Sequence, residues 1–578
     1  MAIPPADRAE PAPPTHSDYP IAPREWGWVL VTTALVLLVA SLPYALIWWS
    51  TPPGMVWPGV LYNFDDQTVY LAWIRQARDG HFFLRNLFTN EPQTGHYVHL
   101  YFAALGMVAR LTGIPLAYHL GRVAGGAVLL LLVYRLAALL TDKVAHRRQI
   151  FLVVALSAGF GWITMGPRVE LSQPVDTWQP EAITFLSLYT NGLFTVSLAA
   201  MAAIVVGLLL AEARRRARYA VGAGLAGLFL ANIHTYDVIT LAAVWLAYLV
   251  VRTIRLRAIP RAALGYALLA AVVALPGVAW MAWFFATETV FQKRVAVPTL
   301  TPPFGRYVVG YGLLWPLCGV GLLGCWRRAR AAVPASFGLA ASLLGVWVVV
   351  GCALPYLPVP FQRKLVQGLH LPVAIGAGLG LALLLDRLAA VGASGRSLAR
   401  AAGALILCVA SLTNVRFVVR DLVVAREQNL ASTGLHPVYW PAEDLRLMRW
   451  MERHLPPTAV VGCFPPTGTL LTVVTGRTVY AGHWGETPAF ERKMQEAIAL
   501  FRGRMGPHQV WSYCRQRGIT HLFVGRLERA LAAGEAETLP PADALPFLAA
   551  LRLLHREGDS AIYLVPAELP PAAVTAPG

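Results

Sequence analysis

The sequence predicts an α-helical protein that crosses a membrane many times and carries a small α/β domain at its C-terminal end. Three observations lead to this fold class. Of the 578 residues, 56% are hydrophobic and only 14% are charged, which is too apolar for a soluble chain of this length. Apolar runs of about 20 residues recur, and each can cross a hydrocarbon core of about 30 Å. Near residue 421 the apolar runs shorten, charge rises, and strand and helix patterns begin to alternate.

The apolar runs predict eleven membrane spans. With these spans, five basic loops all fall on one side of the membrane, among them Arg214–Arg218 and Arg252–Arg261. The positive-inside rule makes that side the cytoplasm, so the N-terminus is cytoplasmic and the C-terminal domain lies outside. The spans are predicted near 27–48, 116–140, 149–166, 182–211, 219–234, 236–252, 261–286, 306–326, 332–353, 365–386 and 399–420.

The first outer loop, 49–115, is predicted to carry two helices that lie at the membrane interface. In 66–79, Val69 and Ile74 are interleaved with Arg75 and Arg78, a pattern typical of an amphipathic helix. The second helix, 97–113, is short and ends in Arg110. Counting it as a span would place all five basic loops outside.

Four parts follow along the chain. Residues 1–26 are Pro-rich and polar and are predicted to be disordered in the cytoplasm. The transmembrane domain is 27–420, the extracytoplasmic α/β domain is 421–567, and a Pro/Ala-rich tail is 568–578. Inside the α/β domain we predict a helix in 436–456, strands at 459–464, 478–482, 520–524 and 561–565, and helices near 488–502, 507–517 and 543–554.

Several function classes are disfavoured. The net charge of +17 lies mostly in short loops between apolar runs, which indicates membrane topology and not nucleic-acid binding. The six cysteines show no close pairs, so neither a disulfide framework nor a zinc site is predicted. The Gly-rich stretches Thr467–Thr469 and Gly482–Gly485 match neither a GxGxxG fingerprint nor a Walker A loop, so no nucleotide site is predicted.

Asp65 and Asp66 are the strongest candidates for a functional site. They follow the first predicted span directly, and carboxylates are costly near lipid, so such a pair is usually kept for a site. The alternative is a solvated loop that holds two acids by chance. Charged residues of both signs share the predicted outer side with the pair, which favours a binding site there over ordinary loop polarity. They are Arg85, Glu91, Asp176, Glu181, His234, Asp237, Glu288, Lys293, Arg294, Arg363 and Lys364.

The layout of the chain resembles the GT-C superfamily of integral-membrane glycosyltransferases. The likeness covers nearly the whole chain: one anchor, a long first outer loop with an acidic pair, interfacial helices, many spans and an outer C-terminal domain. It is similar to the bacterial group that uses polyprenyl-phosphate-linked sugars. Three further stretches carry the resemblance, namely Pro180–Phe185, His234–Asp237 and Phe361–Lys364.

One family signature is missing. The WWDYG-type motif of oligosaccharyltransferases does not occur, and the nearest tryptophan context is His483–Glu486. This argues against N-glycosylation and leaves a lipid, glycan or protein as acceptor.

The resemblance implies transfer of a sugar, hexosyl or pentosyl, from a polyprenyl-phosphate-linked donor to an acceptor hydroxyl. The reaction would take place at the outer face of the bacterial cytoplasmic membrane and would invert the anomeric centre. Asp65 is then the general base that takes the acceptor proton. Asp66 either orients the acceptor or helps to bind a divalent cation such as Mg²⁺ or Mn²⁺.

The leaving lipid phosphate needs cations. Arg363 and Lys364 are the first choice for stabilising it, with snorkelling interface anchors as the alternative. We expect Arg363 to contribute more, because a planar guanidinium holds two phosphate oxygens at once. His234 is the second choice, and it and Asp237 have a helix-terminus hydrogen bond as their alternative role. Asp176 and Glu181 are predicted to complete an acidic rim, by position in the sequence.

Two other functions are compatible with the sequence. A lipid or polysaccharide transporter would also have many spans, but it more often shows inverted repeats and charges at mid-membrane depth. A non-catalytic assembly protein with the same fold is the second, since fold does not determine function. The clustering of acids at one interface favours an enzyme.

Overall fold

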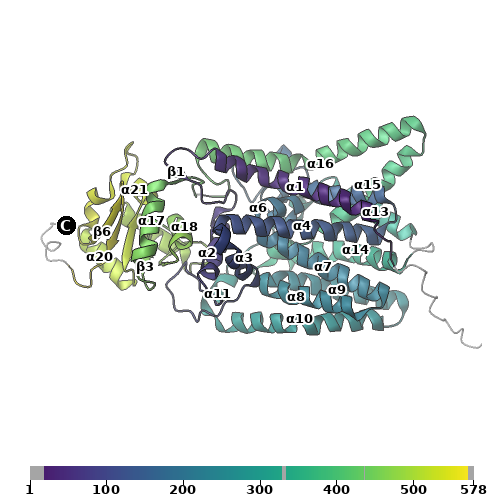
Figure 1. The fold of residues 1–578 in the computed structure, drawn as a ribbon, viewed down its shortest axis with the longest axis horizontal. Helices are drawn as coiled ribbons and strands as arrows, with labels where there is room; N and C mark the ends of the chain where they lie inside the picture. Colours follow the sequence, from purple (N-terminus) through teal and green to yellow (C-terminus); the bar gives the residue numbers. More distant parts are fainter. Residues whose placement is uncertain (1–17, 329–333, 435, 570–578) are drawn as a thin grey trace, which may run out of the picture.

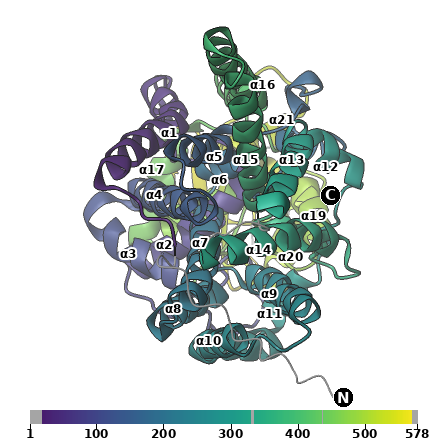
Figure 2. The ribbon, with the colours of Figure 1, turned by 90° about the vertical axis from the view of Figure 1, so that its right-hand side faces the viewer.

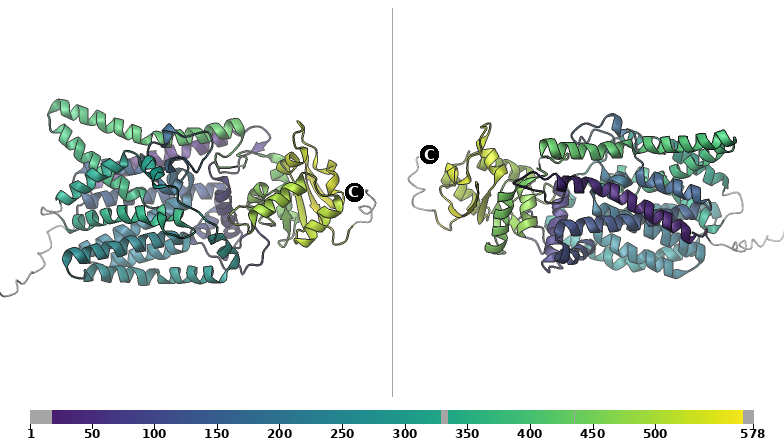
Figure 3. Two further views of the ribbon diagram at one scale, coloured as in Figure 1. Left: turned by 180° about the vertical axis from the view of Figure 1, so that it is seen from behind. Right: turned by 45° about the horizontal axis from the view of Figure 1, so that its top comes forward.

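The computed structural model describes residues 18–328, 334–434 and 436–569. A bundle of long helices forms most of the molecule, and the α/β domain sits at one end of this bundle (Figures 1 and 3). The predicted fold class, a helical membrane protein with a small C-terminal α/β domain, is confirmed. We call the end of the bundle next to the α/β domain the domain-side end. Residues 1–17 of the predicted disordered segment and residues 570–578 of the tail lie outside the described residues, whereas residues 23–26 of that segment belong to a helix that begins at Pro23.

Eight helices in the described part of the chain are long and apolar enough to cross a membrane. A ninth candidate is a broken span, in which α12 (Phe304–Tyr311) and α13 (Leu314–Arg328) meet at 80°. Gly312 stands at this joint with a φ of 46°, a left-handed conformation that favours glycine. The eight are α1 Pro23–Trp49, α4 Ile114–Leu140, α7 Gly192–Arg214, α9 Thr235–Leu256, α10 Arg261–Thr287, α14 Ala335–Ala353, α15 His370–Ala389 and α16 Ala393–Gln428.

The sequence predicted eleven spans, whereas eight or nine helical segments of the described residues are long and apolar enough to cross a membrane. The other two predicted spans fall on α5 (Val144–Leu156, 13 residues) and α8 (Ala217–Ile233, 17 residues). At 1.5 Å per residue they are about 20 and 26 Å long, which is shorter than a hydrocarbon core of about 30 Å. The predicted span 149–166 continues past α5 because the sequence stays apolar there, but the helix ends at Leu156 and an irregular segment follows.

Helix burial explains how the bundle is organised. Viewed along its axis, α7 and α15 lie toward the middle, while α1, α10 and α16 lie toward the outside (Figure 2). Among the candidate spans, α15 and α7 are also the most buried. The predicted span 182–211 is broken in two, because Asn191 caps α7: its Oδ1 accepts hydrogen bonds from the backbone N–H groups of Leu193 and Phe194.

The first loop contains both predicted helices, α2 (Phe64–Arg78) and α3 (Leu100–Thr112). They pack against each other at the domain-side end, and α2 also packs against α18 (Pro465–Thr475) of the α/β domain. Arg75 of α2 is buried against the α/β domain. Its Nη2 lies 2.7 Å from Glu452 Oε1, and its Nη1 donates to the Val473 carbonyl. Helix α2 is thus enclosed by protein on both sides, and its first turn contributes to the site described below.

The α/β domain contains a five-stranded sheet in the order β4-β3-β5-β7-β6. Strand β3 pairs in parallel with β4 and β5, whereas β7 pairs antiparallel with β5 and β6. The strands are β3 Val460–Gly462, β4 Thr478–Val479, β5 His521–Val524, β6 Arg552–Glu557 and β7 Ser560–Leu564. The other helices of the domain are α17 Ala442–His454, α19 Phe490–Phe501, α20 Pro507–Gln516 and α21 Arg526–Ala533.

All four predicted strands are present, but the predicted helix 543–554 is wrong. Two short 3₁₀ turns and β6 occupy this segment. Glu557 pairs with Ser560, so Gly558 and Asp559 form a two-residue hairpin turn, with Gly558 at a φ of 60°. Because the turn pairs β6 with β7, residues 552–557 form a strand and not a helix.

Candidate functional site

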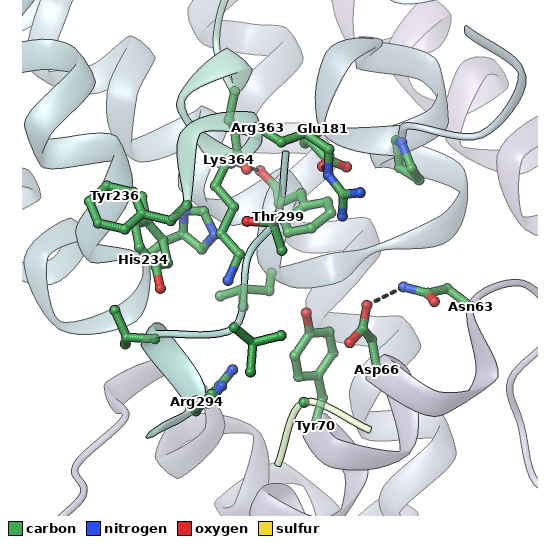
Figure 4. A pocket seen from close by; sticks show the side chains of 18 of the residues that line it. Asn63, Asp66, Tyr70, Glu181, His234, Tyr236, Arg294, Thr299, Arg363 and Lys364 are labelled. Carbon is green, nitrogen blue, oxygen red and sulfur yellow. Dashed lines mark hydrogen bonds and ion pairs between the residues drawn. The ribbon is translucent and has the colours of Figure 1, made fainter. Parts of the chain in front are cut away.

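A cavity of about 680 Å³ lies at the domain-side end of the helix bundle. Its walls come from α2, from the junction of α8 and α9, from α11 (Thr289–Val295) and the chain after it, from a 3₁₀ segment at Gln362–Val366, and from the loop after β4. Figure 4 shows side chains from several of these elements pointing into it. Six of the eight predicted site residues line the cavity: Asp65, Asp66, Glu181, His234, Arg363 and Lys364.

The two aspartates occupy the first turn of α2, where the helix dipole favours negative charge. Asn63 precedes the helix in a left-handed conformation, and its Nδ2 donates to Asp66 Oδ2 (Figure 4). Over the described residues, no hydrogen-bond donor reaches the Asp65 carboxylate, which is 20% exposed. Asp65 is therefore the carboxylate that is free to act on a substrate.

His483 is the residue of this site that sequence reasoning missed. It comes from the loop after β4, and its Nε2 lies 3.0 Å from Asp66 Oδ1 and 4.0 Å from Asp65 Oδ2. Burial raises the pKa of Asp66, but hydrogen bonds from His483 and Asn63 and the charge of Lys364 outweigh it, so this pKa is lowered. In the sequence, His483 stands in a Gly-rich stretch that matches no nucleotide motif and in a tryptophan context that differs from the WWDYG-type motif. Neither pattern connects it with the acid pair.

Arg363 and Lys364 supply positive charge from another wall of the cavity (Figure 4). Lys364 Nζ lies 4.6 Å from the centroid of the Tyr236 ring, and no carboxylate of the described residues is within ion-pair distance of it. Arg363 Nε lies 3.7 Å from Glu181 Oε1, and its guanidinium lies over the Trp178 ring. Arg363 is thus paired with an acid, whereas Lys364 forms no ion pair with the described residues.

His234 forms the junction between α8 and α9, and its side chain lines the cavity. Its Nδ1 lies 3.0 Å from Oδ1 of Asp237, which is fully buried and does not line the cavity. Asp237 is placed to orient the His234 ring and not to contact a substrate.

Asp176 also stays out of the cavity lining. Its Oδ2 accepts hydrogen bonds from the backbone N–H groups of Gly159 (3.1 Å) and Gly161 (3.0 Å), and the residue is fully buried. The structure gives this carboxylate a backbone-holding role. Of the two residues predicted to form the acidic rim, only Glu181 faces the cavity.

Arg294 on α11 is a third cation in the wall. Its Nε lies 2.9 Å from Oε1 of the buried Glu486, and its guanidinium lies over the Trp73 ring. Arg294 is therefore neutralised by an acid of the α/β domain, and it fastens α11 to the loop that carries His483.

The predicted divalent cation finds no ready-made site in the part of the chain that the structure describes. No group of three or more His, Cys, Asp or Glu side chains there is arranged to hold a metal. Asp65, Asp66 and His483 are neighbours, but His483 is engaged in a hydrogen bond with Asp66. Binding of Mg²⁺ or Mn²⁺ stays a prediction.

Among known proteins, this chain is similar to solved structures but not to any family model or curated sequence. The oligosaccharyltransferase AglB from Archaeoglobus fulgidus, in complex with an inhibitory peptide and a dolichol-phosphate, aligns with a TM-score of 0.53 and 14% identity, over 87% of this chain and 70% of that one. The apo form of the Archaeoglobus fulgidus oligosaccharyltransferase gives a TM-score of 0.54 and 13% identity, over 91% and 73%.

The second kind of similar structure is ArnT from Cupriavidus metallidurans bound to undecaprenyl phosphate. It aligns with a TM-score of 0.53 and 13% identity, over 94% of this chain and 98% of that one. AglB and ArnT are both membrane glycosyltransferases of the GT-C superfamily. Over most of its length, this chain therefore has the GT-C fold.

Proposed function

We propose that this protein is a membrane glycosyltransferase. It moves a sugar from a polyprenyl-phosphate-linked donor to an acceptor hydroxyl at the outer face of the bacterial cytoplasmic membrane, with inversion. The observation that carries the proposal is one cavity in which the free carboxylate of Asp65 and the cations Arg363 and Lys364 come from different walls. Similar structures support it, since ArnT is bound to undecaprenyl phosphate and AglB to a dolichol-phosphate.

The chemistry assigns a role to each wall. The acceptor oxygen attacks the anomeric carbon as Asp65 takes its proton, and the bond between that carbon and the phosphate oxygen breaks. Negative charge grows on the leaving polyprenyl phosphate, where Lys364 and Arg363 stabilise it. A base and a leaving-group site on different walls suit attack from the face opposite the leaving group, which inverts the anomeric centre.

A proteoliposome assay separates this function from transport. The purified protein is reconstituted with a polyprenyl-phosphate-linked sugar and an extract of membrane lipids and glycans as the acceptor pool. We expect free polyprenyl phosphate and a new glycosylated product, both read by mass spectrometry. A transporter would move the donor between leaflets with its sugar–phosphate bond intact, and that result would overturn the proposal. A non-catalytic assembly protein would do neither.

If the site lies at the outer face of the membrane, the α/β domain should be accessible from outside the cell. Basic residues such as Arg147 near the start of α5, Arg215 after α7 and Arg255 in the last turn of α9 lie at the opposite end of the bundle, which the positive-inside rule places in the cytoplasm. In a Cys408→Ser background, Ala536→Cys on the α/β domain should react with an impermeant thiol reagent added outside intact cells, and Ala217→Cys should not. Both alanines are exposed in the structure. The reverse labelling pattern would place the cavity on the cytoplasmic side.

A further inference from the structure

The loop that carries His483 is fastened to two other parts of the molecule. Thr487 Oγ1 donates to the Phe88 carbonyl of the first loop (2.8 Å), and Asn86 Nδ2 donates to the Glu486 carbonyl (2.8 Å). The Glu486 side chain pairs with Arg294 of α11. His483 is itself only 4% exposed. The ring thus has a fixed place where the first loop, α11 and the α/β domain meet.

Hydrogen bonding determines which ring nitrogen of His483 carries the proton. The backbone N–H of Gly485 donates to Nδ1 (3.0 Å), so Nδ1 must present its lone pair. The proton is then on Nε2, which donates to Asp66 Oδ1 at 3.0 Å. With Asn63 on the other oxygen, both Asp66 oxygens are occupied. His483 in this state has no free lone pair, so it cannot serve as the base.

We propose that His483 is a positioning residue for the acid pair, and that the site is complete only when the α/β domain supplies it. By holding Asp66, His483 fixes the first turn of α2 and so fixes the direction in which Asp65 faces the acceptor. This inference rests on the proposed function for its effect on turnover. The contact between His483 and Asp66 is testable without any activity.

Thermal unfolding of the full-length protein in detergent tests the contact. His483→Ala and Asp66→Ala should each lower the melting temperature, and the double variant should melt no lower than the less stable single variant, because each substitution removes the hydrogen bond between His483 Nε2 and Asp66 Oδ1. His508→Ala is the matched control, since His508 is an exposed histidine of the same domain. The effect of His508→Ala on the melting temperature should add to that of Asp66→Ala. Additive shifts for His483 and Asp66 would overturn the proposal.

Kinetics test the positioning role. We expect His483→Ala to lower kcat by about tenfold or more, the scale of misplaced catalytic geometry, while KM for the donor changes little. His483→Gln should recover most of the loss, because its amide N–H can still donate to Asp66. Coupled unfolding with an unchanged kcat in His483→Ala would overturn the role. A parent protein that transfers no sugar would instead overturn the proposed function, and the unfolding cycle would still decide the contact.

Discussion

Replacing Asp65 by asparagine should lower sugar transfer by about a hundredfold or more, the usual scale for loss of a general base. Asparagine keeps the size of the side chain but cannot take a proton from the acceptor hydroxyl. The amount of folded protein should change little, because no hydrogen-bond donor of the described residues depends on the Asp65 carboxylate. Initial rates of product formation with the purified variant measure the effect.

A matched carboxylate provides the control for this variant. Glu491 is exposed in the α/β domain and lies outside the cavity lining. Glu491→Gln should transfer sugar at the parent rate. Parent-like transfer by Asp65→Asn, with normal folding, would rule out Asp65 as the base. Asp66, already held by Asn63 and His483, would be a poor substitute.

Removing the cations should weaken donor binding, and Arg363→Ala should weaken it more than Lys364→Ala. A hydrogen bond to a charged group contributes about 1.5–3 kcal/mol, so loss of Lys364 should cost about 10- to 100-fold in affinity. Loss of Arg363 removes a planar donor and also leaves Glu181 in the cavity wall without its cation, which repels the phosphate. Binding of a polyprenyl-phosphate analogue to the purified variants gives both affinities.

The Glu181 effect can be isolated with a double variant. Arg363→Ala with Glu181→Gln should bind the analogue more tightly than Arg363→Ala alone, since the uncompensated charge is gone. Equal binding by the parent and both single variants would show that Arg363 and Lys364 are only interfacial anchors. The phosphate would then have to be sought at His234 or Arg294, which also line the cavity.

The cavity-lining residues that the sequence indicated share one physical property. Asp65, His234, Arg363 and their neighbours all flank predicted spans on one side, so they share one layer at one end of the bundle. Apolar run length and basic loops were enough to sort them. The same reasoning predicted the fold class, because a membrane imposes both the helix lengths and the distribution of charge.

Other parts of the site depend on tertiary contacts that leave no local signal. His483 is 417 residues from Asp66 and meets it only because the α/β domain docks on the first loop. Asp176 and Asp237 look like site carboxylates in the sequence, yet one holds backbone N–H groups and the other faces a histidine inside the protein. Burial of a carboxylate cannot be predicted from residue type alone.

The most direct test of the proposed function follows the sugar–phosphate bond itself. A donor labelled with ¹³C at the anomeric carbon is incubated with the purified protein and the membrane acceptor pool, and NMR records the configuration of the labelled carbon. We predict release of one polyprenyl phosphate for each sugar transferred, with the anomeric configuration inverted. In Asp65→Asn, the NMR resonance of the inverted product should be lost. A donor that remains intact with the parent protein, or a product with retained configuration, would contradict direct attack assisted by Asp65.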